Sequence, residues 1–121
     1  RILTNTVEAL SREYDSNPKD LIVGMGSAIR GCCYELDEPC ALPFVKKSLL
    51  CSEFINKTGG NKFFLDLPKV NRFEGHEAGV LMENIYTDGP CTSCENHRWY
   101  SYRREGKTGR LITLAMLQSR E

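Results

Sequence analysis

Reactive and charged side chains are concentrated between Cys91 and Leu117. A Cys-x-x-Cys motif opens this stretch, aromatic and arginine residues follow, and a Gly-Lys-Thr-Gly turn leads into an apolar end. Two thiolates at this spacing can bind one metal ion, and neighbouring guanidinium groups can hold a phosphate or a carboxylate through paired hydrogen bonds. The stretch therefore has the composition of a binding or catalytic surface.

The motif at Cys91–Cys94 has two metal-binding interpretations and one without metal. A structural zinc needs two further ligands, for which Cys32–Cys33 and His97 are candidates, although neither has a conventional spacing. A zinc deaminase would combine Pro-Cys-x-x-Cys with an upstream His-x-Glu, whereas His76 is followed directly by Glu77. The interpretation without metal, two thiols in a tight turn, is the one we favour from the sequence.

The second chemical candidate is the run Ser101, Tyr102, Arg103 and Arg104, with Arg110 beyond the glycine-bracketed turn. Two or three guanidinium groups beside a glycine turn can bind a phosphate or a carboxylate. The alternative is a hairpin whose arginines pair with surface carboxylates. From the residues alone, both interpretations stay open.

Composition narrows the classes of partner. Sixteen basic residues balance sixteen acidic ones, so we expect no general attraction to nucleic acid. No apolar run reaches the roughly 20 residues of a membrane span, so no membrane partner is predicted. Six cysteines would suit a secreted disulfide framework, but the clear helix and strand patterns favour free thiols in a reducing compartment. We therefore expect a cytoplasmic location.

The residue pattern predicts one helix at the start of the chain and another between Asp66 and Gly79. An amphipathic helix runs from the first residue to about Tyr14, where an Asp-Ser-Asn-Pro cluster ends it. A helix already established at residue 1, without a cap, suggests that the chain is the later part of something larger. Asp66 is the expected N-cap of another helix, which ends near Gly79.

The remaining predictions complete the fold class. They are a buried strand over 21–25, a loop over 26–33, an extended or turn segment over 34–37, a helix over 44–50, a break over 56–61, and strands over 63–65, 84–86 and 111–117. This order of helices and strands indicates an α+β fold of mixed α/β layers. A chain of this length fits one domain, over residues 1–121.

Four segments of the chain resemble the laccase-domain family. They are residues 22–35 with their Gly-Cys-Cys-Tyr-Glu end, residues 64–67 with Asn71, the motif at 91–94, and residues 101–110 with the letters SYRREGKTGR. Members of this family were described as multicopper polyphenol oxidoreductases, and the better-described ones are zinc-dependent purine nucleoside-processing enzymes. The first segment departs from the family pattern at Met25, Ser27, Ala28 and Arg30.

The resemblance implies that the chain is the C-terminal portion of a larger laccase-domain fold. In the family, the metal-binding and catalytic residues lie in earlier segments that nothing in this chain matches. We therefore predict no catalytic residue and no metal ligand within residues 1–121, and Cys32–Cys33 and Cys91–Cys94 match positions that are not family metal ligands. Zinc, or copper in the older description, is expected in the intact domain with its ligands upstream of residue 1.

The activity implied for the intact domain is phosphorolysis or deamination, with a purine nucleoside and phosphate as substrates. Phosphorolysis needs cations that hold an anionic nucleophile, a role we assign to Arg103, Arg104 or Arg110, with Ser101 and Tyr102 as hydrogen-bonding neighbours. The chain alone is expected to be inactive. The alternatives are a non-catalytic fragment, a partner-binding subunit completed by the missing N-terminal half, and a small thiolate-zinc module.

Overall fold

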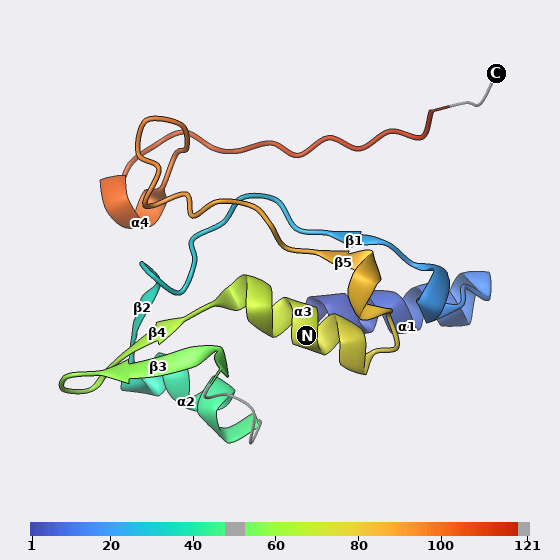
Figure 1. Ribbon diagram of the computed structural model, residues 1–121, viewed down its shortest axis with the longest axis horizontal. Helices are drawn as coiled ribbons and strands as arrows, with labels where there is room; N and C mark the ends of the chain where they lie inside the picture. Colours follow the sequence, from blue (N-terminus) through green and yellow to red (C-terminus); the bar gives the residue numbers. More distant parts are fainter. Residues whose placement is uncertain (48–52, 119–121) are drawn as a thin grey trace.

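The computed structural model describes residues 1–47 and 53–118, which form helices and two small sheets (Figure 1). The helices are α1 (Ile2–Tyr14), α2 (Glu38–Lys47), α3 (Leu67–Glu77) and α4 (Tyr102–Glu105), and single 3-10 turns cover Pro18–Asp20 and Met82–Asn84. The strands are β1 (Val23–Gly24), β2 (Glu35–Asp37), β3 (Ile55–Thr58), β4 (Lys62–Leu65) and β5 (Ile85–Tyr86). This mixture of helix and sheet in one small domain confirms the predicted α+β class.

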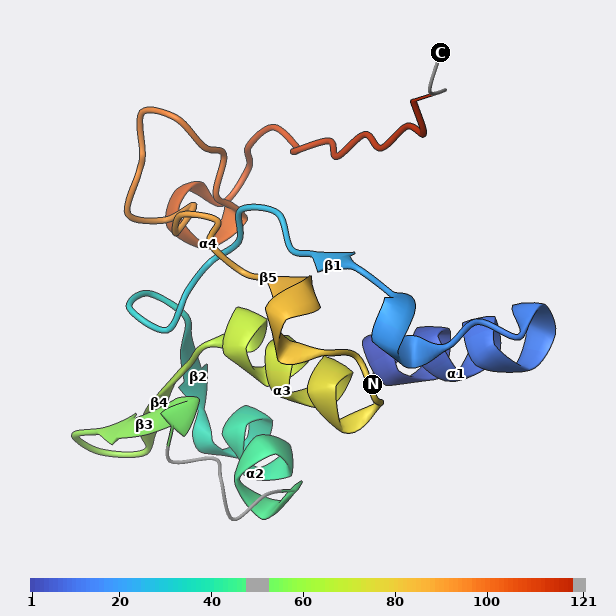
Figure 2. The same cartoon turned by 45° about the vertical axis from the view of Figure 1, so that its right-hand side comes forward.

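The three-stranded sheet and α2 enclose one apolar core. The strand order is β2-β4-β3 with antiparallel pairing, and α2 packs against the sheet (Figure 2). Its buried residues are Ala41, Ile55, Phe63 and Leu65, and we call this group the sheet core. Leu65 and Ala41 are fully excluded from solvent, so apolar burial holds this layer together.

A second core joins α1 to α3 and the parallel pair β1-β5. Val7, Val80 and Ile85 are buried there. The two helices approach closely at Gly75, because a Cβ at that position would lie 3.0 Å from a methyl carbon of Leu3. Glycine at this crossing therefore fixes how α1 lies on α3, and α3 in turn carries the chain from β4 toward β5.

The helix boundaries around α1 and α3 confirm the sequence predictions. The helix α1 ends at Tyr14, followed by Asp15 with φ of 53°. The side chain of Asp66 caps α3 by accepting a hydrogen bond from the backbone N–H of Lys69 at 3.2 Å. Gly79 follows the helix with φ of 100°, a conformation that glycine adopts without strain.

Three predicted elements differ in extent from those observed. The strand expected over 21–25 is confined to β1, and Ile22 is 74% exposed, because the partner strand β5 is only two residues long. The break expected over 56–61 begins instead at Gly59, since the polar residues of β3 occupy an exposed edge strand. The helix expected over 44–50 begins at Glu38, and its residues 48–50 lie outside the described residues.

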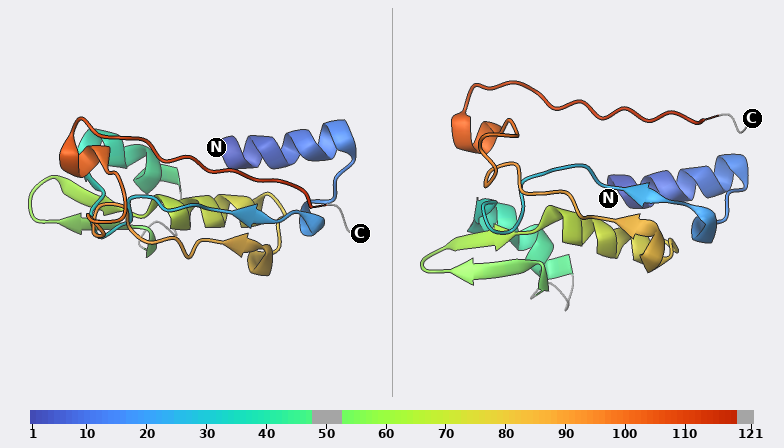
Figure 3. Two further views of the ribbon diagram at one scale, coloured as in Figure 1. Left: turned by 90° about the horizontal axis from the view of Figure 1, so that it is seen from above. Right: turned by 45° about the horizontal axis from the view of Figure 1, so that its top comes forward.

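The strand predicted over 111–117 is wrong. This segment has no regular secondary structure and extends away from α4 (Figures 1 and 3). Its large apolar side chains are exposed, from 43% at Leu111 to 99% at Leu117. A strand needs a neighbour for its backbone hydrogen bonds, and the sheets of the described residues offer this segment none. Among residues 1–47 and 53–118, no helix is long and apolar enough to span a membrane.

Candidate functional site

The site is built where the chain after β1 meets the chain after β5. The parallel pairing of Val23 with Ile85 continues as a bridge between Ala28 and Cys91. The backbone N–H of Thr92 donates to the carbonyl of Ala28 at 3.1 Å. Two segments about sixty residues apart in the sequence are thus held in a fixed register, and each carries two cysteines at or just beyond the bridge.

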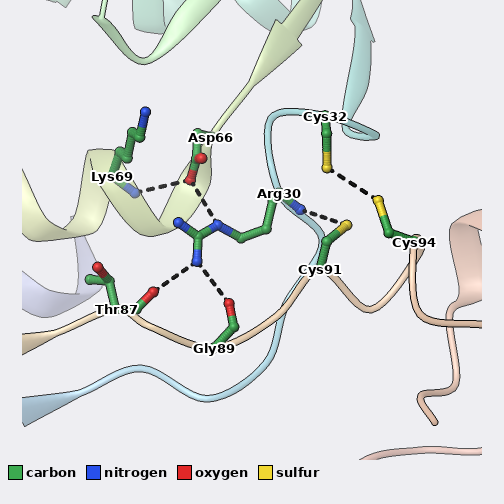
Figure 4. A network of polar contacts seen from close by, with 8 residues as sticks. All are labelled: Arg30, Cys32, Asp66, Lys69, Thr87, Gly89, Cys91 and Cys94. Atoms are coloured by element: carbon green, nitrogen blue, oxygen red, sulfur yellow. Dashed lines mark hydrogen bonds and ion pairs between the residues drawn. The ribbon is translucent and has the colours of Figure 1, made fainter.

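Arg30 ties these two segments to α3 (Figure 4). Its guanidinium donates to the carbonyls of Thr87 at 2.8 Å and Gly89 at 2.9 Å, and its Nε lies 3.4 Å from the Asp66 carboxylate. Asp66 is the N-cap of α3, so one largely buried arginine connects the helix start to the loop before Cys91. Arg30 departs from the family pattern, yet here it is central to the geometry of the loop.

Four cysteines converge at this point, two on each segment. Their sulfur atoms all lie within 4.8 Å of one another, in the group Cys32, Cys33, Cys91 and Cys94. The sulfur of Cys94 is 3.4 Å from those of Cys32 and Cys33. The described cysteines are free thiols, so the arrangement offers four sulfur donors to a single ion.

The two segments create different electrostatic surroundings for their thiols. Burial acts to raise the pKa of Cys91, but hydrogen bonds from the backbone N–H groups of Arg30, Cys94 and Ser93 outweigh it and lower that pKa to about 6. Burial, followed by thiol hydrogen bonds led by that from Cys94, raises the pKa of Cys32. Cys91 is therefore the sulfur whose thiolate form the backbone stabilises.

The guanidinium of Arg104 makes its hydrogen bonds to other residues of the protein. It donates to the carbonyls of Thr92 at 2.8 Å, Ser93 at 2.9 Å and Trp99 at 2.9 Å, and it also pairs with the carboxylate of Glu105. Two of these carbonyls belong to the turn between Cys91 and Cys94. Arg104 therefore attaches α4 to the cysteine motif.

The other predicted substrate residues lie at or near α4. Arg103 donates to the Glu35 carbonyl at 2.7 Å and stacks over the ring of Tyr34 with 4.9 Å to the centroid. Ser101 is buried at the start of α4, and Tyr102 is 69% exposed. Arg110 is exposed beyond the Gly106 turn. The structure thus places three of the five residues on one short helix and a fourth, Ser101, at its N-cap, and their contact with substrate stays a prediction.

The two histidines take no part in the cysteine cluster. His76 is exposed on α3 and its Nδ1 lies 3.2 Å from the Val80 carbonyl, while His97 is exposed in the loop after Cys94. Within the described ranges, the candidate metal group consists of cysteines alone. This donor set does not fit the imidazole-containing sites that copper oxidation uses, nor the deaminase arrangement of a histidine beside two cysteines.

The fold, together with the sequence segments that resemble a known family, defines the class of protein to which this chain belongs. Residues 1–118 match the family described as multi-copper polyphenol oxidoreductase laccase, and the chain belongs to that family. It is 32% identical over 108 residues to purine nucleoside phosphorylase YlmD of Bacillus subtilis, covering 88% of this chain and 39% of that protein. It is 36% identical over 98 residues to the protein of the same name from Geobacillus stearothermophilus, covering 78% of this chain and 35% of that one.

A solved structure supports the same assignment. The Bacillus licheniformis hypothetical protein YfiH superposes with a TM-score of 0.80 at 29% identity, over 85% of this chain and 39% of that one. The chain therefore spans about two fifths of the length of the relatives that it matches. Its fold is the corresponding part of the laccase-domain fold.

Proposed function

We propose that this chain is the phosphate-binding part of a purine nucleoside phosphorylase. The observation that carries the proposal is its identity of 32% and 36% to two proteins named as purine nucleoside phosphorylases, over most of its own length. The whole enzyme would act on a purine nucleoside and inorganic phosphate. The free thiols of the described cysteines support a reducing, cytoplasmic setting for this enzyme.

Phosphorolysis places clear demands on the protein. A phosphate oxygen forms a bond to the anomeric carbon of the sugar, the glycosidic bond to the purine nitrogen breaks, and the bonding electrons leave with the base. The nucleophile is an anion that must approach an electron-poor sugar carbon in a fixed orientation. Guanidinium groups suit this task, because their N–H donors match phosphate oxygens in pairs.

The geometry divides the arginines into two roles. Arg104 spends its donors on three backbone carbonyls and a carboxylate, so we assign it to positioning α4. Arg103 and Arg110 are exposed, and we assign phosphate binding to them. Tyr102, exposed beside Arg103, is the neighbour best placed to hydrogen-bond a substrate, whereas buried Ser101 supports the helix start.

The proposal places the catalytic metal ion of the intact enzyme outside this chain. Zinc would supply an open coordination position for water or substrate, and we assign its ligands to the portion of the relatives that this chain does not cover. The cysteine cluster does not fit that role, since four thiolates close a tetrahedral site. No step of phosphorolysis is assigned to the cluster.

The exposed end of the chain favours completion of the enzyme by a further segment. Ile112, Leu114, Met116 and Leu117 carry apolar side chains that the described residues leave uncovered. A group of large apolar side chains exposed together is typical of an interface. We propose that the missing N-terminal half covers it, whether that half is joined to this chain or separate.

The test uses a chimaera in which this chain replaces the matching two fifths of Geobacillus stearothermophilus YlmD. We expect release of free purine and ribose 1-phosphate from inosine only when phosphate is present. Arg103→Ala and Arg110→Ala should each raise the KM for phosphate by about tenfold, the loss of one charge-assisted contact of about 1.4 kcal/mol. Arg12→Ala, an exposed arginine on α1 paired with Glu13, is the matched control and should change nothing.

Three results would overturn the proposal. Base release that is independent of phosphate would exclude phosphorolysis, and ammonia release from adenosine without base release would assign deamination instead. An unchanged KM for phosphate in both arginine variants would remove the phosphate-binding role from α4 and its following turn. The 121-residue chain alone should show no turnover.

A further inference from the structure

The four sulfur atoms beyond the Ala28–Cys91 bridge have the dimensions of a metal site. A zinc ion with four Zn–S bonds of about 2.3 Å places its sulfurs about 3.8 Å apart at the corners of a tetrahedron. The observed cluster has close sulfur pairs at 3.4 Å and no sulfur–sulfur separation above 4.8 Å. These separations therefore differ from the tetrahedral value by about 1 Å or less.

The backbone around the sulfurs is arranged as it is around metal-bound thiolates. The N–H of Arg30 donates to the sulfur of Cys91 at 3.4 Å (Figure 4), and the backbone N–H groups of Ser93 and Cys94 also hydrogen-bond this sulfur. Such donors fix the direction of a thiolate and offset its negative charge. Two of these donors, Ser93 and Cys94, come from the turn that also joins Cys91 to Cys94, so this motif is a preformed half of a site.

The other half comes from the turn that contains Cys32 and Cys33. This turn is closed by the N–H of Cys33 donating to the Arg30 carbonyl at 2.9 Å. Arg30 is itself held by the carbonyls of Thr87 and Gly89 and by Asp66. Both halves are thus built on backbone that other contacts already hold, which lowers the cost of ordering a metal site.

We propose that Cys32, Cys33, Cys91 and Cys94 bind one zinc ion as a structural tetrathiolate. Binding forms four Zn–S bonds and releases to solvent the proton of each thiol that is still protonated. All four positions of the ion are filled by sulfur, so the ion cross-links the two segments and performs no catalysis. A tetrahedral set of four thiolates selects zinc over copper(II), which prefers nitrogen and oxygen ligands in a tetragonal geometry.

The site has a consequence for α4. The carbonyls of Thr92 and Ser93 lie within the Cys91–Cys94 turn and accept hydrogen bonds from Arg104. A bound ion fixes this turn and therefore fixes the helix that carries Arg103. The inference rests on the cysteine geometry alone and does not depend on the proposed phosphorolysis.

The experiment measures metal binding by the purified 121-residue chain under reducing conditions. We expect one zinc per chain by elemental analysis. Cobalt(II) added to the metal-free chain should give the intense visible bands and the thiolate-to-cobalt charge-transfer absorption of a tetrahedral tetrathiolate. Chelation of zinc should increase the number of thiols open to alkylation by four.

Replacing any one of the four cysteines by serine should weaken zinc binding by at least about a hundredfold, which exceeds the loss expected from a residue that only supports a ligand. The variants are Cys32→Ser, Cys33→Ser, Cys91→Ser and Cys94→Ser.

Cys40→Ser is the matched control, because Cys40 is an exposed cysteine on α2 outside the cluster, and its variant should bind zinc as the parent chain does. X-ray absorption of the zinc-loaded parent chain keeps the test independent of variant folding, with four sulfur neighbours expected at about 2.3 Å. The proposal is overturned by a chain that binds no zinc, by iron in its place, by fewer than four sulfur neighbours, or by an equal loss in the Cys40 variant. An intact mass two protons lower without zinc would assign a disulfide instead.

Discussion

The sheet core and the cysteine-containing region are held together by different physical means. In the sheet core, Leu65 and Ala41 are fully buried among other apolar side chains. In residues 26–33 and 87–105, which we call the thiolate–arginine region, the buried side chains are those of Cys91, Thr92 and Ser101. This region relies on guanidinium-to-carbonyl bonds and on its thiols. Apolar burial can hold a layer by itself, whereas a region of loops needs specific cross-links.

The largest expected effect comes from the sheet core. Leu65→Ala removes a fully buried side chain and should lower the free energy of unfolding by about 2–5 kcal/mol, through lost apolar transfer and a residual cavity. Denaturant unfolding followed by circular dichroism measures the loss. Leu114→Ala is the control, because this side chain is 89% exposed, and its effect should stay within about 0.5 kcal/mol. Equal effects at the two positions would refute the distinction between core and exposed tail.

A smaller effect is expected where the two segments of the thiolate–arginine region touch. A Cβ on Gly89 would lie 3.0 Å from the Ser27 nitrogen and 3.1 Å from the Gly26 carbonyl, and backbone cannot move aside as a flexible side chain can. Gly89→Ala should therefore cost about 1–3 kcal/mol. Gly24→Ala, where a Cβ meets nothing within 4 Å, should be close to neutral. Denaturant unfolding of both variants checks the contrast, and a neutral Gly89→Ala would show that the segments are not in contact.

The smallest expected effect concerns the end of α4. A hydrogen bond from the Thr108 hydroxyl, together with Arg104, holds the pKa of Glu105 below its ordinary value. The folded pKa is below the unfolded one, so this stabilisation is present above the unfolded pKa and is lost as pH falls through the folded pKa. Thr108→Val should move the Glu105 midpoint upward in a carbon-13 NMR titration. An unchanged midpoint would contradict the contact.

Local signals in the sequence predict the helices well. Asp66 with Pro68 marks the start of α3, and Gly79 marks its end, because capping and left-handed backbone depend on single residue types. The apolar run at 111–117 shows the limit of such signals. Its residues favour a strand, but pairing depends on a neighbour that the pattern of the run does not specify.

The candidate site depends on a contact that is remote in sequence. Each cysteine pair is visible in the sequence, but their meeting depends on the parallel pairing of β1 with β5 and its continuation to Ala28 and Cys91. The strand pattern at 21–25 and at 84–86 is the signal that could have suggested it. The hydrogen bonds from Arg104 to backbone carbonyls could not be predicted, since the run of arginines is equally suited to an exposed anion-binding site.

The central claim is that the thiolate–arginine region needs a metal cross-link and the sheet core does not. Hydrogen–deuterium exchange of the 121-residue chain, with zinc and after its removal, tests this most directly. We predict that removal of zinc lowers amide protection over residues 28–34 and 91–105 and leaves residues 62–77 protected. Unchanged protection in the first two ranges, or an equal loss across all three, would contradict the account.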